Sequence, residues 1–118
     1  MTHAPLPIPI EKYLAAKGGT DVDEILSCFT EDATVSDVGE DRELIGTDQI
    51  RGWLSNTVAG YKLTSELRTF EPVGDSFVAS IVVSGDFPGS PYEFLYRFTL
   101  SGDKIAALII EPIGSLAP

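Results

Sequence analysis

The stretch DVDEILSCFTEDATVSD, residues 21–37, decides the fold because a helical pattern runs directly into a strand pattern. Four apolar residues recur at the i, i+3, i+4 and i+7 spacing of an amphipathic helix: Val22, Ile25, Leu26 and Phe29. Thr20 is the expected N-cap, with Asp23 completing a short capping box in an acidic first turn that the helix dipole favours. Residues 30–36 then indicate a short strand that leads to Asp37.

An earlier helix precedes this stretch. Prolines alternate with apolar residues near the N-terminus, and Pro9 suits a first helical position because its missing N–H needs no partner there. The helical spacing then continues through Ile10, Tyr13 and Leu14. Gly18-Gly19 is expected to end this helix, which leaves residues 1–7 as a flexible arm.

A third helix is predicted after a polar, turn-like segment, residues 38–44. Thr47 is its expected N-cap, and the apolar spacing returns at Ile50, Trp53 and Leu54. Beyond Gly60 the period changes to that of strands, in residues 61–70, 76–87, 92–100 and 104–112. The element order α-α-β-α-β-β-β-β indicates one α+β domain over residues 1–118, with residues 113–118 as a tail.

The charge of the chain limits its partners. Eighteen acids and eight bases give a formal charge of −10, and eleven of the acids with three of the bases lie in the first 48 residues. Nucleic acid and anionic membranes are excluded as expected partners, because both need clustered Lys and Arg. No membrane-spanning run or signal peptide is recognisable, so we expect a cytoplasmic protein.

Histidine and cysteine restrict the chemistry further. His3 is the only histidine, which excludes a Ser-His-Asp triad and histidine zinc sites within one chain. Cys28 is the only cysteine and is predicted to be a buried apolar residue. We expect neither a metal nor a cofactor, and we interpret as solvated carboxylates an acid cluster that lacks loop-ligand spacing: Glu31, Asp32, Asp37, Glu40, Asp41 and Glu43.

The helix-2 phrase D-x-D-E-I-x-x-x-F-x-E-D-A-x-V-x-D and the G-x-x-x-I before the third helix resemble the nuclear transport factor 2-like superfamily, which includes SnoaL-like cyclases and ketosteroid isomerases. The resemblance covers about residues 8–112. It implies a cone: a strongly curved, mostly antiparallel sheet wrapped around three helices, also described as a cystatin-like α+β barrel, with a cavity between the layers. It also implies a homodimer through the sheet face.

Ketosteroid isomerase is the most informative comparison within that superfamily. Aligned through Y-x-A-A and A-T-V-x-D, Tyr13 falls on the family's helix-1 tyrosine and Asp37 on its catalytic aspartate. The resemblance implies that Asp37 acts as general base on a C–H next to a carbonyl, while Tyr13 donates a hydrogen bond to the oxygen. Phe94 falls where the family has a protonated aspartate, so half of that oxyanion hole is missing.

The remaining candidate site residues are aromatic. Phe94, Tyr96 and Phe98 share one face of a predicted strand, and Trp53 is expected to face them. With Phe29, the residues Trp53, Phe94 and Tyr96 form the predicted wall of a pocket for a small, neutral, apolar or cyclic carbonyl compound. The same residues could instead fill a core, Asp37 could cap its own turn, and Tyr13 could be a packing residue.

Two hypotheses for function therefore remain. In the first, the protein is a cofactor-free isomerase, cyclase or dehydratase that uses Asp37 and Tyr13. In the second, it is a non-catalytic ligand-binding or dimeric accessory protein of the same fold. The missing acid at position 94 favours the second, and the retained Tyr13/Asp37 pair favours the first.

Overall fold

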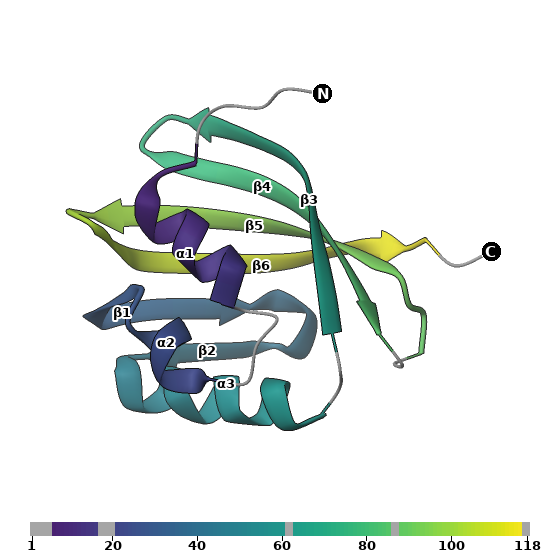
Figure 1. The fold of residues 1–118 in the computed structure, drawn as a ribbon, viewed down its shortest axis with the longest axis horizontal. Helices are drawn as coiled ribbons and strands as arrows, with labels where there is room; N and C mark the ends of the chain where they lie inside the picture. Colours follow the sequence, from purple (N-terminus) through teal and green to yellow (C-terminus); the bar gives the residue numbers. More distant parts are fainter. Residues whose placement is uncertain (1–5, 17–20, 61–62, 86–87, 117–118) are drawn as a thin grey trace.

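The computed structural model describes residues 6–16, 21–60, 63–85 and 88–116 (Figure 1). Its helices are α1 (Ile8–Ala16), α2 (Val22–Leu26) and α3 (Thr47–Gly60), with a 3-10 turn η1 (Val38–Glu40). Its strands are β1 (Phe29–Asp37), β2 (Arg42–Ile45), β3 (Leu63–Val73), β4 (Ser76–Gly85), β5 (Tyr92–Ser101) and β6 (Lys104–Ser115). No helix among these residues is long and apolar enough to cross a membrane.

The six strands form one open sheet in the order β2-β1-β6-β5-β4-β3. All neighbours are antiparallel except β1 and β6, which run parallel. The helices lie on one face, and β3 curls across that side of the sheet (Figure 1). Register shifts interrupt the β3–β4, β5–β6 and β1–β6 ladders, and such irregularities bend and twist strands. The predicted α+β cone is confirmed, although the sheet does not close into a barrel.

The interior lies between the helices and the concave face of the sheet. Tyr96 and Phe98 of β5 contact Tyr13 of α1, which identifies their face as the concave one. Strand alternation then places Glu93 and Arg97 on the outer face, as the sequence predicted. The aromatic face of β5 is therefore held against the helices.

The first departure from the predicted elements is β2. The segment after Asp37 is not only a turn, because η1 and then Asp41, with a left-handed φ of 53°, reverse the chain into a strand. Asp tolerates this backbone region better than most residues. Residues Arg42–Ile45 pair antiparallel with the end of β1, from Thr34↔Ile45 to Asp37↔Arg42. This hairpin fixes the end of β1.

The second departure concerns the ends of predicted elements. Asp21 is the N-cap of α2, and its Oδ1 accepts a hydrogen bond from the Glu24 N–H at 3.1 Å. The predicted cap, Thr20, lies outside the described residues. Phe29 opens β1 instead of continuing the helix, because the Ile105 N–H bonds the Cys28 carbonyl at 2.7 Å and joins the chain to the sheet. At the other end, β6 continues to Ser115, beyond the predicted start of the tail.

Candidate functional site

Asp37 ends β1 on the concave face. It pairs with Ile110 of β6, and alternation along β1 gives it the same face as Ala33 and Val35, both fully buried. Asp37 itself is only half-buried, so the strand passes from the closed interior to a more accessible end at this residue. The sequence therefore places its carboxylate at the edge of the apolar interior.

The Asp37 carboxylate is held by Trp53. The indole Nε1–H of Trp53 donates a hydrogen bond to Asp37 Oδ2 over 3.1 Å. Asp37 is the N-cap residue of η1, yet its side chain makes no capping hydrogen bond. The turn-capping alternative is therefore wrong, since the partner of the carboxylate comes from a helix 16 residues away.

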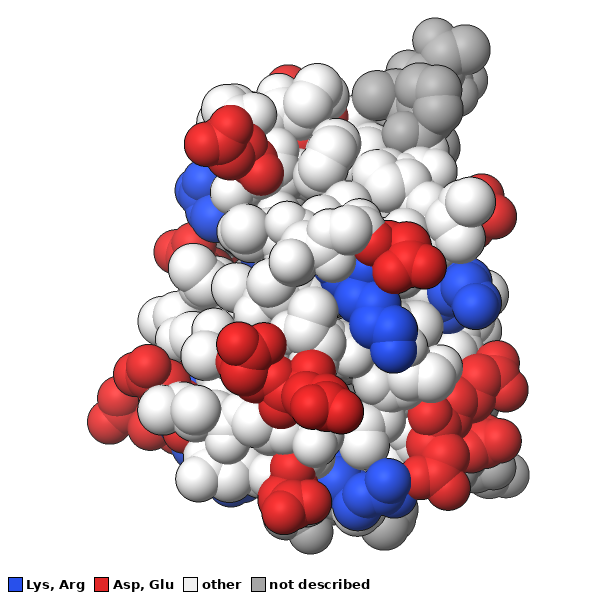
Figure 2. Space-filling model, turned by 90° about the vertical axis from the view of Figure 1, so that its left-hand side faces the viewer, with Lys and Arg blue, Asp and Glu red and all other residues white. Residues whose placement is uncertain are grey.

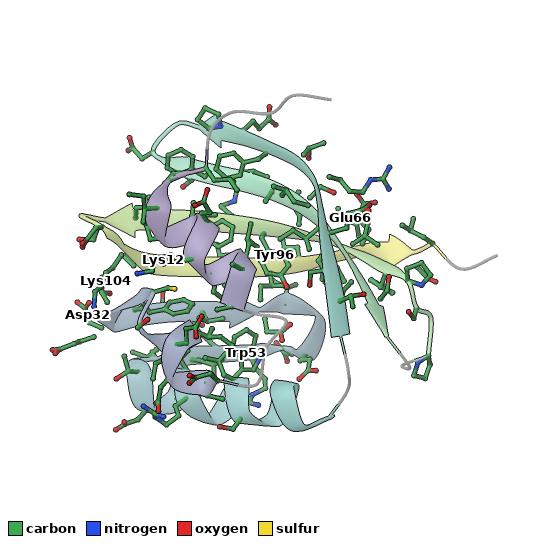
Figure 3. All side chains as sticks on the ribbon, in the orientation of Figure 1. Lys12, Asp32, Trp53, Glu66, Tyr96 and Lys104 are labelled. Carbon is green, nitrogen blue, oxygen red and sulfur yellow. The ribbon has the colours of Figure 1, made fainter. Side chains whose placement is uncertain are left out.

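Trp53 itself rises from α3 toward the sheet (Figure 3). It is 6% exposed, so its ring is part of the apolar interior as the sequence predicted. A buried indole N–H needs an acceptor, and Asp37 supplies it. Trp53 also orients the carboxylate, a contact that the sequence did not predict.

Tyr13 projects from α1 into the aromatic cluster. Its ring lies edge-on to Phe29 and to Phe98, with centroid distances of 5.6 and 5.8 Å, and tilted against Tyr96 at 6.5 Å. The side chain is 2% exposed, and burial raises its pKa well above the usual 10.0, with smaller contributions from Tyr96, Cys28 and the charge of Asp37. Tyr13 therefore keeps its proton at neutral pH and can act as a donor.

Tyr96 occupies the middle of the sheet (Figure 3). Its ring packs against that of Tyr13. It is 5% exposed and pairs with Ile110 on one side and Ala79 on the other. Burial raises the pKa of the Tyr96 hydroxyl, and the Asp37 charge raises it further. A second protonated phenol thus lies within electrostatic reach of the same carboxylate.

The other two candidate residues lie at different depths. Phe29 is buried at the start of β1 against Tyr13. Phe94 is half-buried and packs against Tyr92, with ring centroids 5.0 Å apart, while Phe98 on the same face is fully buried. The concave face of β5 therefore becomes more accessible toward Phe94. Across the sheet, Phe94 pairs with Pro112 of β6. Pro112 lies two residues after Ile110, the residue that pairs with Asp37.

The remaining acids of the predicted cluster point to solvent. All five of these acids are exposed: Glu31, Asp32, Glu40, Asp41 and Glu43. On the face shown in Figure 2, acidic side chains form separate groups with basic side chains between them. Among the residues that the structure describes, no group of three or more His, Cys, Asp or Glu is placed to hold a metal ion. Cys28 is buried, and this burial raises its thiol pKa.

The arrangement combines one oriented carboxylate at the edge of the interior with two protonated phenols in the buried aromatic cluster. A carboxylate can accept a proton from an acidic C–H, and phenols can stabilise the oxygen that receives the charge. The sequence identified Asp37 and Tyr13 but missed two features. These are the Trp53–Asp37 hydrogen bond and the electrostatic influence of Asp37 on the buried Tyr96.

Comparison with known proteins agrees with this fold. Residues 10–108 match the SnoaL-like domain. A candidate polyketide cyclase from Sinorhizobium meliloti is 31% identical and has a TM-score of 0.82, with 90% of this chain and 95% of that chain covered. No curated protein matches the chain.

Two more distant solved structures share the fold alone. One is a protein of ketosteroid isomerase-like fold from Catenulispora acidiphila, solved in complex with trimethylamine. It is 22% identical with a TM-score of 0.80, covering 95% of this chain and 88% of that chain. The other is a nuclear transport factor 2-like protein from Cytophaga hutchinsonii, 10% identical with a TM-score of 0.71, covering 89% and 87%.

Proposed function

The chain belongs to the SnoaL-like family, and on that premise we propose that it binds a small, neutral, largely apolar carbonyl compound beside Asp37. We propose further that it abstracts a proton next to the carbonyl, giving isomerisation, cyclisation or dehydration without a cofactor. The observation that carries this proposal is the hydrogen bond from Trp53 Nε1 to Asp37 Oδ2, which holds the carboxylate at the aromatic interior instead of in its turn.

The proposed step moves one proton from the ligand to Asp37. The C–H bond next to the carbonyl breaks, its proton goes to the Asp37 carboxylate, and its electron pair forms a C=C bond. The carbonyl π electrons move to oxygen, which becomes an enolate accepting a hydrogen bond from Tyr13. Return of the proton from Asp37 to another carbon isomerises the ligand. Dehydration would instead break the bond between a β-carbon and its hydroxyl, the enolate electrons forming the C=C bond and the Asp37 proton joining the hydroxyl to release water. The negative charge passes from Asp37 to the ligand, so a neutral substrate suits the site better than an anion.

A non-catalytic binder is the second candidate, and Phe94 favours it. This residue stands at the accessible end of β5, packs against Tyr92 and offers the ligand no hydrogen-bond donor. Loss of one oxyanion donor typically slows a reaction by about 10²–10³-fold. A binder would keep the ligand class proposed above and lack the proton transfer.

Binding is tested with Trp53, the only tryptophan in the chain. Cyclohex-2-en-1-one is titrated while the single indole N–H signal is followed by ¹H–¹⁵N NMR, with a cyclohexene carboxylate as the anionic counterpart. We expect the neutral enone to shift the signal saturably and the carboxylate to bind more weakly. Equal shifts with the two compounds, or none with either, would contradict the proposed ligand class.

We also propose that the outer face of the sheet pairs with a second copy of the chain. Figure 1 shows the helices on the opposite face. By strand register, neighbouring strands bring apolar residues to this outer face, namely Val78, Val82, Leu95 and Ile109. A dimer is expected in light scattering after size exclusion, and Leu95→Arg should make it a monomer. A wild-type monomer at micromolar concentration would contradict the proposal.

A further inference from the structure

We propose that Tyr96 is a second hydrogen-bond donor to the carbonyl oxygen of the ligand, acting beside Tyr13. This inference rests on the proton abstraction proposed above. It assigns to Tyr96 a role in charge stabilisation in addition to its place in the aromatic wall. The substrate class becomes narrower as well, because two donors favour a ligand whose oxygen carries full negative charge during the reaction.

The strand register places Tyr96 and Asp37 in one row across the concave face. Asp37 pairs with Ile110, and Ile110 pairs in turn with Tyr96. Directly paired residues share a face, and adjacent strands are about 4.8 Å apart, so the two backbones are about 10 Å apart with one apolar residue between them. Beyond Tyr96 the row continues with Ala79, whose methyl group takes little space. The row therefore has the Asp37 carboxylate at one end and Tyr96 at the other, with Ile110 between them.

Tyr13 brings a second phenol to the same place from the helix layer. Its ring centroid lies 6.5 Å from that of Tyr96, with an angle of 49° between the ring planes. Phe98 packs against both rings, at 5.8 Å from Tyr13 and 6.1 Å from Tyr96. The two phenol rings thus belong to one buried aromatic cluster and come from two different elements.

Electrostatics link both phenols to Asp37. Burial is the main cause of the raised pKa of each hydroxyl, and the Asp37 charge raises both further. Both therefore stay protonated, which a donor requires. When a proton moves from the ligand to Asp37, the negative charge leaves the carboxylate and appears on the ligand oxygen. Two donors already oriented in the protein favour that state over the neutral ketone.

Tyr96 also supplies the hydrogen-bond donor that Phe94 cannot. Both residues point to the concave face, and Phe94 lies one step nearer the accessible end of β5. A donor at position 96 is more deeply buried than one at 94, and hydrogen bonds to charge are stronger where water is excluded. The oxygen of the ligand would accordingly enter first and lie at the buried end of the site.

The test uses 2-naphthol, a planar phenol that presents an enol-like oxygen, and naphthalene, which lacks that oxygen. Affinities are measured by calorimetry for wild type, Tyr13→Phe, Tyr96→Phe and the matched control Tyr92→Phe on the same strand. We expect Tyr96→Phe to weaken 2-naphthol about tenfold or more and to leave naphthalene unchanged. Tyr92→Phe should leave both unchanged.

The outcomes separate this inference from the proposed function. If Tyr96→Phe binds 2-naphthol like wild type while Tyr13→Phe weakens it, Tyr96 is no donor and the proposed function stands. If wild type binds neither probe, the proposed ligand class fails and this inference with it. Should Tyr96→Phe not fold, 3-fluorotyrosine at position 96 replaces it. This stronger donor is expected to tighten 2-naphthol several-fold, and an unchanged affinity would overturn the inference.

Discussion

Replacing Trp53 by Phe removes the indole N–H that orients Asp37 and keeps most of the aromatic ring. The 3.1 Å hydrogen bond goes to a carboxylate, and bonds to charged groups contribute about 1.5–3 kcal/mol to stability. Because Asp37 is only half-buried, water can replace part of the lost bond, which favours the lower end of about 1.5 kcal/mol. The smaller ring in a site that is 6% exposed adds about 1 kcal/mol of lost packing. The expected loss is about 2–3 kcal/mol.

Urea unfolding, followed by far-UV circular dichroism, measures this loss as a lower midpoint. With a slope of about 1–3 kcal/mol per molar urea, the midpoint should fall by roughly 0.7–3 M. A double-mutant cycle with Asp37→Ala separates the bond from the packing, and a coupling free energy of about 1 kcal/mol or more is expected. A coupling near zero would refute the reasoning, since the bond would then contribute nothing to stability even if Trp53→Phe alone were destabilising.

Three further predictions concern ionisation and helix capping. Because the pKa values of Tyr13 and Tyr96 are raised by burial, their neutral forms stabilise the fold fully below the usual 10.0, and this stability is lost as pH rises further. Urea midpoints should fall above pH 10 in wild type and less steeply in Tyr13→Phe; equal slopes would contradict this. Asp21→Ala removes the cap bond to the Glu24 N–H and should cost about 1 kcal/mol in the same assay, whereas no change would show the cap to be unimportant. Buried Cys28 should react slowly with a thiol reagent at neutral pH in the native state and rapidly in urea, and fast native reaction would show the thiol to be accessible.

Local periodicity predicted most of the fold. The helical spacing before Phe29 and the strand that ends at Asp37 both depend on residues close together in the chain, so one sequence carries the signal. The hairpin to β2 had no such signal, since the strand has only four residues, two polar and then two apolar, and shows no period-2 alternation. Its turn depends on the left-handed conformation of Asp41, which Asp adopts only in some contexts.

The candidate site was less predictable because its decisive contacts are tertiary. The sequence placed Trp53 on the correct face of a helix, but its bond to Asp37 depends on how that helix crosses the sheet. Likewise, the row from Asp37 to Tyr96 exists only through β6, which follows both residues in the chain. Residue types and spacing could suggest a base and a donor, whereas the partners of each required the packed structure.

Proton exchange into a cyclic enone tests the central claim, that Asp37 removes a proton next to a carbonyl. Wild type, Asp37→Asn and the exposed same-strand control Asp32→Asn are incubated with cyclohex-2-en-1-one in D₂O, and loss of the ring protons that exchange through the enolate is followed by NMR. We expect catalysed exchange by wild type and Asp32→Asn, and a rate at least about 10²-fold lower with Asp37→Asn, the lower end of what a positioned base contributes. Equal rates for Asp37→Asn and wild type, in protein shown to be folded, would contradict Asp37 as the base.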